Sequence, residues 1–240
     1  MLLTVGVLLV VFLAATTWLG RSERVELALP PVGRVLIVSN AGPVELRNGQ
    51  ANTFVGNESW LFNRPVIETL ADGDEVVVRV TCGGSMPCRS ASTLTVTAGT
   101  EVVVVSTAGP VLVAKFGGDV TVYDGYGDTA LGAVTGSVKV VSEKGGVFGS
   151  GLAVSRIDVS TVSSEVALDF LILPERVLVV TGPEATRLRL PEGEVSLSID
   201  SPEELQNLEI DSTAGAPTEI VIRSEGPVSV TPPVNVQPKE

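Results

Sequence analysis

The chain has 240 residues, a formal net charge of −12 and no histidine. Nucleic acids and anionic lipid surfaces are bound through basic faces, so the charge argues against a nucleic-acid partner and against electrostatic docking on lipid. The missing histidine removes the commonest general base and the commonest metal ligand.

The first segment is apolar, since residues 2–20 contain no charged side chain. A helix of this length spans the hydrocarbon core of a bilayer, and Trp18 stands near its end, where interfacial tryptophan is favoured. A cleaved signal peptide is the alternative, but the run is long for one and no Ala-x-Ala site ends it. We therefore predict that residues 1–24 form an uncleaved transmembrane anchor of a single-pass cell-membrane protein.

The orientation of this anchor has conflicting signals. Arg21 and Arg24 follow the span and no basic residue precedes it, so the positive-inside rule would leave the bulk of the chain in the cytoplasm. We expect the opposite, with the bulk extracytoplasmic. One reason is that no basic segment stands ahead of the span, so the true start is expected upstream. The other reason is the cysteine pair, which favours an oxidising compartment.

Cys82 and Cys88 are the only cysteines, and the residues between them are Gly-Gly-Ser-Met-Pro. This turn joins two predicted strands, 75–81 and 93–96, so the two thiols are well placed for a disulfide. A zinc site would need four ligands, and a redox pair is more usually Cys-x-x-Cys. We predict a structural disulfide between Cys82 and Cys88, with free thiols as the alternative and no metal site.

An internal repeat of about 18 residues runs from residue 106 to residue 177. Each unit opens on a small polar residue, followed three positions later by a glycine or serine: Ser106, Asp124, Ser142, Ser160 and Gly109, Gly127, Gly145, Ser163. A fixed period of this length indicates stacked repeats. We expect the glycines to supply the positive φ of tight corners.

Two apolar positions recur in each unit, and we expect both to face the core. They are Leu112, Ala130, Phe148, Val166 and Tyr123, Val141, Val159, Val177. The strands between the corners alternate apolar and polar residues, which is typical of half-buried strands. We predict that residues 25–225 form an all-β, β-solenoid or β-helix-like stack of short strands. A β-sandwich of hairpins is the alternative, because it has similar turn spacing.

The corner phrase Ser106–Val111 recurs outside the regular repeats. A similar phrase stands at Ser39–Val44, which predicts an early rung of the same stack. The first four residues of the phrase recur at Ser212–Gly215, ahead of a predicted strand at 219–222. From residue 226 onward the chain is rich in proline. We predict that residues 226–240 form a disordered tail.

Several of these features together resemble the bacterial DUF4097-type adhesin family. They are the apolar N-terminal segment, the cysteine pair in a strand–turn–strand, and the phrases Ser106–Val111, Gly118–Val122 and Ser160–Val166. The resemblance covers about residues 75–200, with fewer clean rungs than is usual in the family. It implies a β-solenoid-like extracytoplasmic domain on a membrane anchor, with no catalytic residues to transfer.

The function expected on this basis is that of a non-catalytic adhesin or envelope interaction scaffold without a cofactor. Its partners would be the membrane, through the N-terminal helix, and a protein or cell-surface partner. A regulatory sensor domain for envelope stress is an alternative that the sequence does not separate from this one.

Two further alternatives depend on carboxylates. Ca²⁺ binding by a β-roll would use Asp119, Asp124 and Asp128 in the glycine-rich corners, although the Gly-Gly-x-Gly-x-Asp nonapeptide is absent. A glycosidase-type enzyme would use paired carboxylates, for which the candidates are Asp158, Glu165 and Asp169. These three show only the alternation of solvent-facing residues, so we predict that the chain is not an enzyme.

Two aromatic residues and a proline, Trp60, Phe62 and Pro65, interrupt the regular pattern. Such a group more often closes the end of a core than contacts a ligand. We expect the first role and keep a ligand-facing patch as the alternative.

Overall fold

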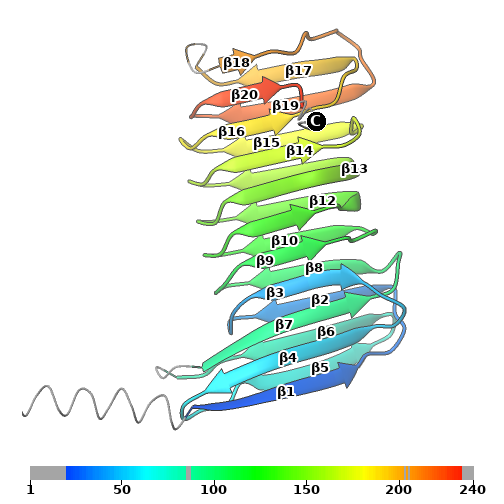
Figure 1. Cartoon of the computed structure of the whole chain (residues 1–240), viewed down its shortest axis with the longest axis vertical. Helices are drawn as coiled ribbons and strands as arrows, with labels where there is room; N and C mark the ends of the chain where they lie inside the picture. Colours follow the sequence, from blue (N-terminus) through cyan, green and yellow to red (C-terminus); the bar gives the residue numbers. More distant parts are fainter. Residues whose placement is uncertain (1–19, 85–87, 203, 205, 234–240) are drawn as a thin grey trace, which may run out of the picture.

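The structure is a computed structural model that describes residues 20–84, 88–202, 204 and 206–233. Its 20 strands form an elongated stack, with the N-terminal strands at one end and the C-terminal strands at the other (Figure 1). The all-β prediction is confirmed. Within the described ranges no helix is long and apolar enough to cross a membrane. The predicted anchor falls mostly on residues 1–19, which lie outside the described residues.

The middle of the stack consists of two parallel ladders of strands. Sheet B contains β8 (Glu101–Ser106), β10 (Val120–Asp124), β12 (Thr135–Ser142), the second half of β13 (Val147–Thr161) and β15 (Arg176–Thr181). Sheet A contains β9 (Val111–Ala114), β11 (Thr129–Gly132), the first half of β13, β14 (Val166–Phe170) and β16 (Thr186–Arg189). One sheet-B strand and the sheet-A strand that follows it form one rung.

Each rung pairs in parallel with its neighbour at an offset of one repeat. Val120 of β10, for example, lies opposite Val102 on one side and Val138 on the other. Val120 and Val122 are buried, whereas Tyr123 is exposed, because successive side chains of a strand point to opposite faces. Burial of one valine contributes about 1.5–3 kcal/mol. The inner faces of both sheets join into one hydrophobic core.

The prediction that both apolar columns face the core is wrong for the first repeats. Leu112 and Phe148 are exposed on the outer face of sheet A, and Tyr123 is exposed on the outer face of sheet B. The inward positions lie one residue earlier, and a one-residue offset moves every side chain of a strand to the other face. Val159, Val166 and Val177 are buried as predicted.

The change of face comes from a lengthened repeat at β13. Gly136 pairs with Val154 but Ser137 pairs with Arg156, so Ser155 is an extra residue in the strand. Bulges of this kind add one residue to one strand of a pair. The counterpart of Ser142 is therefore Thr161, and the expected corner residue Ser160 lies on the outer face.

The N-terminal end departs from chain order. Sheet A ends in antiparallel strands β7 (Cys88–Val96), β4 (Thr53–Trp60) and β1 (Arg21–Ala28), and sheet B ends in the antiparallel pair β6 (Glu75–Thr81) and β5 (Val66–Asp72). The strands β2 (Arg34–Ser39) and β3 (Val44–Asn48) insert between these and the middle rungs. Ser39 lies opposite Ser106 and Val44 opposite Val111, so the predicted early rung is confirmed.

At the C-terminal end, too, the strands are not stacked in chain order. The strands β19 (Thr218–Ser224) and β20 (Val228–Thr231) pair with β15 and β16, and β17 (Val195–Asp200) and β18 (Gln206–Leu208) lie outside them. The phrase Ser212–Gly215 precedes β19 and is therefore not a counterpart of the Ser106–Val111 corner. The corner at this level begins at Ser224, whose Oγ donates a hydrogen bond to the Gly226 carbonyl at 3.2 Å.

Two predicted boundaries move as a result. The strand β20 places Val228 and Val230 in the core, so the fold continues past residue 225 to Thr231. The predicted anchor included residues 21–24. These residues pair with β4 as the start of strand β1, so they belong to the β fold instead.

The corner from sheet B to sheet A is held by the polar residue that opens each repeat. Ser142 Oγ donates to the Gly145 carbonyl at 2.7 Å and accepts from the Gly145 amide at 3.0 Å. Ser106 Oγ donates to the Gly109 carbonyl at 3.1 Å, and Asp124 accepts from the Gly127 amide at 3.1 Å. Short polar side chains favour such turns because they bond to nearby backbone groups.

The glycines of this corner have a different role from the one predicted. Gly109 has a φ of 120°, but Gly127 and Gly145 lie outside the positive-φ region. A Cβ at Gly127 would overlap the Gly109 carbonyl, and one at Gly145 would overlap the Gly127 carbonyl. Close stacking of successive corners therefore requires glycine here.

Candidate functional site

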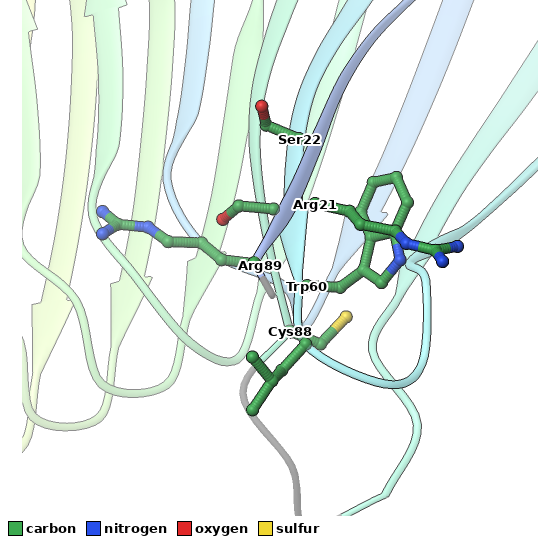
Figure 2. Close-up of a pocket in the computed structure, with 8 residues that line it drawn as sticks. Arg21, Ser22, Trp60, Cys88 and Arg89 are labelled. Atoms are coloured by element: carbon green, nitrogen blue, oxygen red, sulfur yellow. The ribbon is translucent and has the colours of Figure 1, made fainter. Parts of the chain in front are cut away.

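A hollow of about 750 Å³ opens at the N-terminal end of the stack, where β1 and β7 begin and β4 ends. We call it the N-terminal hollow. Its lining residues are Gly20, Arg21, Ser22, Ser59, Trp60, Leu61, Cys88 and Arg89. Figure 2 shows that the guanidinium groups of Arg21 and Arg89 extend away from each other, with Trp60 near Arg21. The two cations therefore do not converge on a single point.

The strand register explains which residues meet at the hollow. Arg21 lies opposite Trp60, and Trp60 lies opposite Cys88, so the three form one row across β1, β4 and β7. Ser22, Ser59 and Arg89 form the next row in the same way. The hollow thus combines two arginines and an aromatic ring at the outermost edge of sheet A.

The predicted disulfide between Cys82 and Cys88 is confirmed, with the two Cα atoms 5.7 Å apart. Cys82 follows β6 of sheet B, and Cys88 begins β7 of sheet A. The bond therefore ties the two sheets together beside the hollow, where β1, β4 and β5 leave the regular parallel ladders.

A buried carboxylate lies behind the hollow. Glu58 is 2% exposed on the inner face of β4. Arg64 Nε donates to Glu58 Oε2 at 2.8 Å, and an Arg64 terminal nitrogen lies 3.1 Å from Glu23. This hydrogen bond to Glu58 raises the pKa of the Arg64 guanidinium above its ordinary value. The Arg64 guanidinium also lies over the Trp60 ring, 5.5 Å from its centroid, which holds the loop at residues 61–65 back against β4.

The three residues predicted to close the end of the core, Trp60, Phe62 and Pro65, lie in different environments. Phe62 is 66% exposed and is not a core residue, whereas Pro65 is buried. Trp60 is partly buried and lines the hollow. Glu58 and Arg64 were not predicted from the sequence. A signal was present, because Glu58 follows Phe54 and Gly56 at the inward positions of one strand.

The negative charge is unevenly distributed along the chain. Residues 1–100 contain seven arginines and eight acidic residues, and residues 101–240 contain nine basic and twenty acidic residues. The first part is therefore almost neutral at −1, and the second carries −11. Net charge therefore disfavours anionic partners at the middle and C-terminal rungs, but not at the end that carries the hollow.

The carboxylates considered for Ca²⁺ bond to backbone amides instead. Asp119 accepts from the Ser137 amide at 3.0 Å, Asp128 from the Gly146 amide at 2.8 Å, and Asp124 from the Gly127 amide. Burial raises the pKa of Asp124, and hydrogen bonds from the Gly127 and Tyr126 amides oppose that rise. Among the described residues, no three His, Cys, Asp or Glu side chains are grouped to hold a metal.

The carboxylates considered for catalysis are not brought together. Asp158 lies in the sheet-B half of β13, and Asp169 lies in β14 of sheet A. Glu165 pairs with Arg187 at 2.9 Å. These three residues therefore do not form the paired-carboxylate arrangement that glycoside hydrolysis requires.

No protein-family model matches the chain, and no curated protein matches it. Among solved structures, a "putative lipid binding protein" from Parabacteroides distasonis matches 88% of this chain and 96% of its own, at 9% identity and a TM-score of 0.53. A "putative adhesin" from Bacteroides fragilis matches 89% and 97% at 9% identity, with a TM-score of 0.46. A "putative cell adhesion protein" from Clostridium sporogenes matches 89% and 100% at 10% identity, with a TM-score of 0.37. The first likeness shows a shared fold.

Proposed function

We propose that this chain is a non-catalytic, membrane-anchored extracytoplasmic scaffold of the adhesin type. The observation that carries the proposal is the Cys82–Cys88 disulfide, which lies beside Gly20 and Arg21, where the described chain begins. Disulfides persist in oxidising compartments and are rare in the cytosol. The strand β1 begins at Arg21, directly after the apolar run 2–20. A stack anchored in this way would project its rungs away from the membrane.

The finer interpretation of the fold is a β-solenoid that serves as a rigid display element. Support comes from the parallel offset of 18 residues, which recurs from β8 to β10 to β12 and from β9 to β11 to β13. Repeats of this kind contact mainly their neighbours and build long, regular surfaces. Such surfaces suit the binding of a partner better than the enclosure of a substrate.

The placement is tested with the full chain carrying a cleavage site for a specific protease after residue 233. The protease is added to intact cells, to spheroplasts and to lysate, with a cytoplasmic protein carrying the same site as the control. Cleavage in intact cells or spheroplasts, while the control stays uncut, supports the proposal. If the site is cut only in lysate, together with the control, the extracytoplasmic scaffold is excluded.

A further inference from the structure

Four residues occupy successive rungs at one position on the outer face of sheet A, and we call them the outer column. Leu112 lies opposite Ala130, Ala130 opposite Phe148, and Phe148 opposite Ala167. Leu112 is 41% exposed and Phe148 is 39% exposed. The outer column therefore alternates large and small apolar side chains along the stack.

Three of the sheet-A strands that carry the outer column contain no charged residue. They are β9, β11 and the sheet-A half of β13, residues 147–152, whereas β14, which carries Ala167, also contains Asp169. Apolar patches of about 300–600 Å² occur on most single-chain proteins and are often functional.

The outer column ends in opposite charges. Glu45 of β3 lies opposite Leu112 at one end, and Arg187 of β16 lies opposite Ala167 at the other. Both are surface side chains, and Arg187 also pairs with Glu165 at 2.9 Å. The sequence of side chains along the stack is therefore acid, large, small, large, small, base.

The outer column is complementary to the same column turned upside down, because each large side chain then faces a small one and each charge faces the opposite charge. A two-fold axis parallel to the strands, passing between the Ala130 and Phe148 rungs, would turn a second copy upside down and bring the two outer columns face to face. Phe148 would then meet the partner's Ala130, Leu112 would meet the partner's Ala167, and Glu45 would meet the partner's Arg187. Self-complementarity of one patch is the requirement for a two-fold interface.

We propose that the partner of this face is a second copy of the chain, packed antiparallel through the outer column. The parallel arrangement is disfavoured because it would place Glu45 against Glu45 and Phe148 against Phe148, which gives like-charge repulsion and a steric conflict. The antiparallel arrangement places a large side chain over a small one at every apolar level.

An antiparallel pair has its two N-terminal ends at opposite ends of the assembly. On the proposed function, on which this step rests, each N-terminal end is held at a membrane. The two copies would then come from two facing membranes, so the contact is an adhesive one between like molecules.

The size of the patch indicates a weak contact. Five steps of about 4.8 Å separate the Glu45 and Arg187 rungs, and four residues of strand span about 13 Å, which gives about 300 Å² per copy. Stable interfaces bury about 800 Å² per partner. Two membranes that carry many copies can nevertheless adhere firmly, because each contact that forms makes the next one effectively intramolecular.

Cross-linking of the detergent-solubilised full chain tests the pairing. Leu112→Cys and Ala167→Cys variants are mixed and oxidised, with the native disulfide retained. The antiparallel contact predicts a covalent dimer in the mixture and little in either variant alone, because Leu112 lies about 14 Å along the stack from the partner's Leu112. A dimer that forms equally in each variant alone, or no dimer in the mixture, overturns the proposal.

Vesicle clustering tests the adhesive consequence. Full chain is reconstituted in phosphatidylcholine vesicles and clustering is followed by light scattering. Phe148→Arg is expected to abolish clustering, and Tyr123→Arg, at a similarly exposed position on sheet B, is expected to preserve it. Glu45→Arg and Arg187→Glu should each weaken clustering, and the two together should restore it.

The two proposals fail in different ways. A chain that the protease experiment places in the cytoplasm removes the membrane-to-membrane role, while cross-linking still decides whether the antiparallel pair forms. Clustering that survives Phe148→Arg but is lost with Tyr123→Arg would assign the contact to sheet B and overturn the outer column as the interface.

Discussion

Arg64 Nε donates a 2.8 Å hydrogen bond to the buried Oε2 of Glu58, while Glu58 Oε1 has no hydrogen-bond partner among the described residues. The Glu58 carboxylate thus depends on one half-exposed guanidinium for its pairing. A buried charge that loses its partner is strongly destabilising, because the remaining ion has neither water nor a counter-charge.

We therefore expect Arg64→Ala to lower the melting temperature by several degrees. Adding Glu58→Gln should recover most of the loss, since the buried group is then neutral. The control is Arg24→Ala, which breaks an exposed pair with Glu26 and should have little effect. Equal melting temperatures for Arg64→Ala and Arg24→Ala would contradict this account of Glu58.

The corner glycines provide a matched pair of substitutions. A Cβ at Gly127 would overlap the Gly109 carbonyl, whereas at Gly125 the nearest atom is the Thr107 Cα at 3.5 Å, an ordinary contact. Gly127→Ala should lower the free energy of unfolding by about 1–3 kcal/mol, as overpacking does. Gly125→Ala should change it little. Urea unfolding of the two variants measures the difference, and similar values would exclude close stacking as the reason for glycine.

The Asp124 corner should be sensitive to pH. Burial raises the pKa of Asp124, so the folded state holds the proton more tightly than the unfolded state, where the pKa is near 3.9. The wild-type protein therefore loses stability as pH rises from the unfolded pKa through the folded pKa. The Asp124→Ser variant places at this corner the residue that Ser142 supplies in the next repeat. It has no carboxyl group there, so it should not lose stability in this way as pH rises.

We predict that Asp124→Ser is more stable than the wild type at pH 7 and that the gap narrows as pH falls toward 4. Urea unfolding across this range measures the gap. A gap that widens on acidification would mean that the charged carboxylate is the favoured form in the corner.

The corners could be predicted from the sequence because their chemistry is local. Ser106, Asp124 and Ser142 bond to backbone groups two to three residues away, so the pattern is visible within one repeat. The echo at Ser39 was informative for the same reason. Cys82 and Cys88 were predictable because only a short turn separates them.

The order of the rungs and the facing of the strands could not be predicted. The strand β2 inserts between β6 and β8, yet all three carry similar valine-rich alternation, and every open strand edge offers the same backbone groups. The inner and outer faces are both apolar at Leu112 and Phe148, so periodicity alone did not distinguish them. The extra residue at Ser155 became visible only through the register of β12 and β13.

The disulfide should contribute measurably to the stability of the N-terminal end. Closing a loop of this length by a cross-link stabilises a fold by about 2–3 kcal/mol in the chain-entropy model. Replacing both Cys82 and Cys88 by serine should lower the free energy of unfolding by about that amount. Reduction of the wild type should lower it equally, and an unchanged value in both experiments would show that the cross-link is not a stabilising element.

The most direct test of the proposed extracytoplasmic placement is the oxidation state of Cys82 and Cys88 in native membranes. Membranes are prepared from cells whose thiols were blocked before lysis, and the full chain is labelled with a maleimide with and without prior reduction. We predict labelling only after reduction, which is the behaviour of a disulfide formed in an oxidising compartment. Thiols that are already blocked before reduction would place the domain in the cytoplasm and contradict the scaffold proposed here.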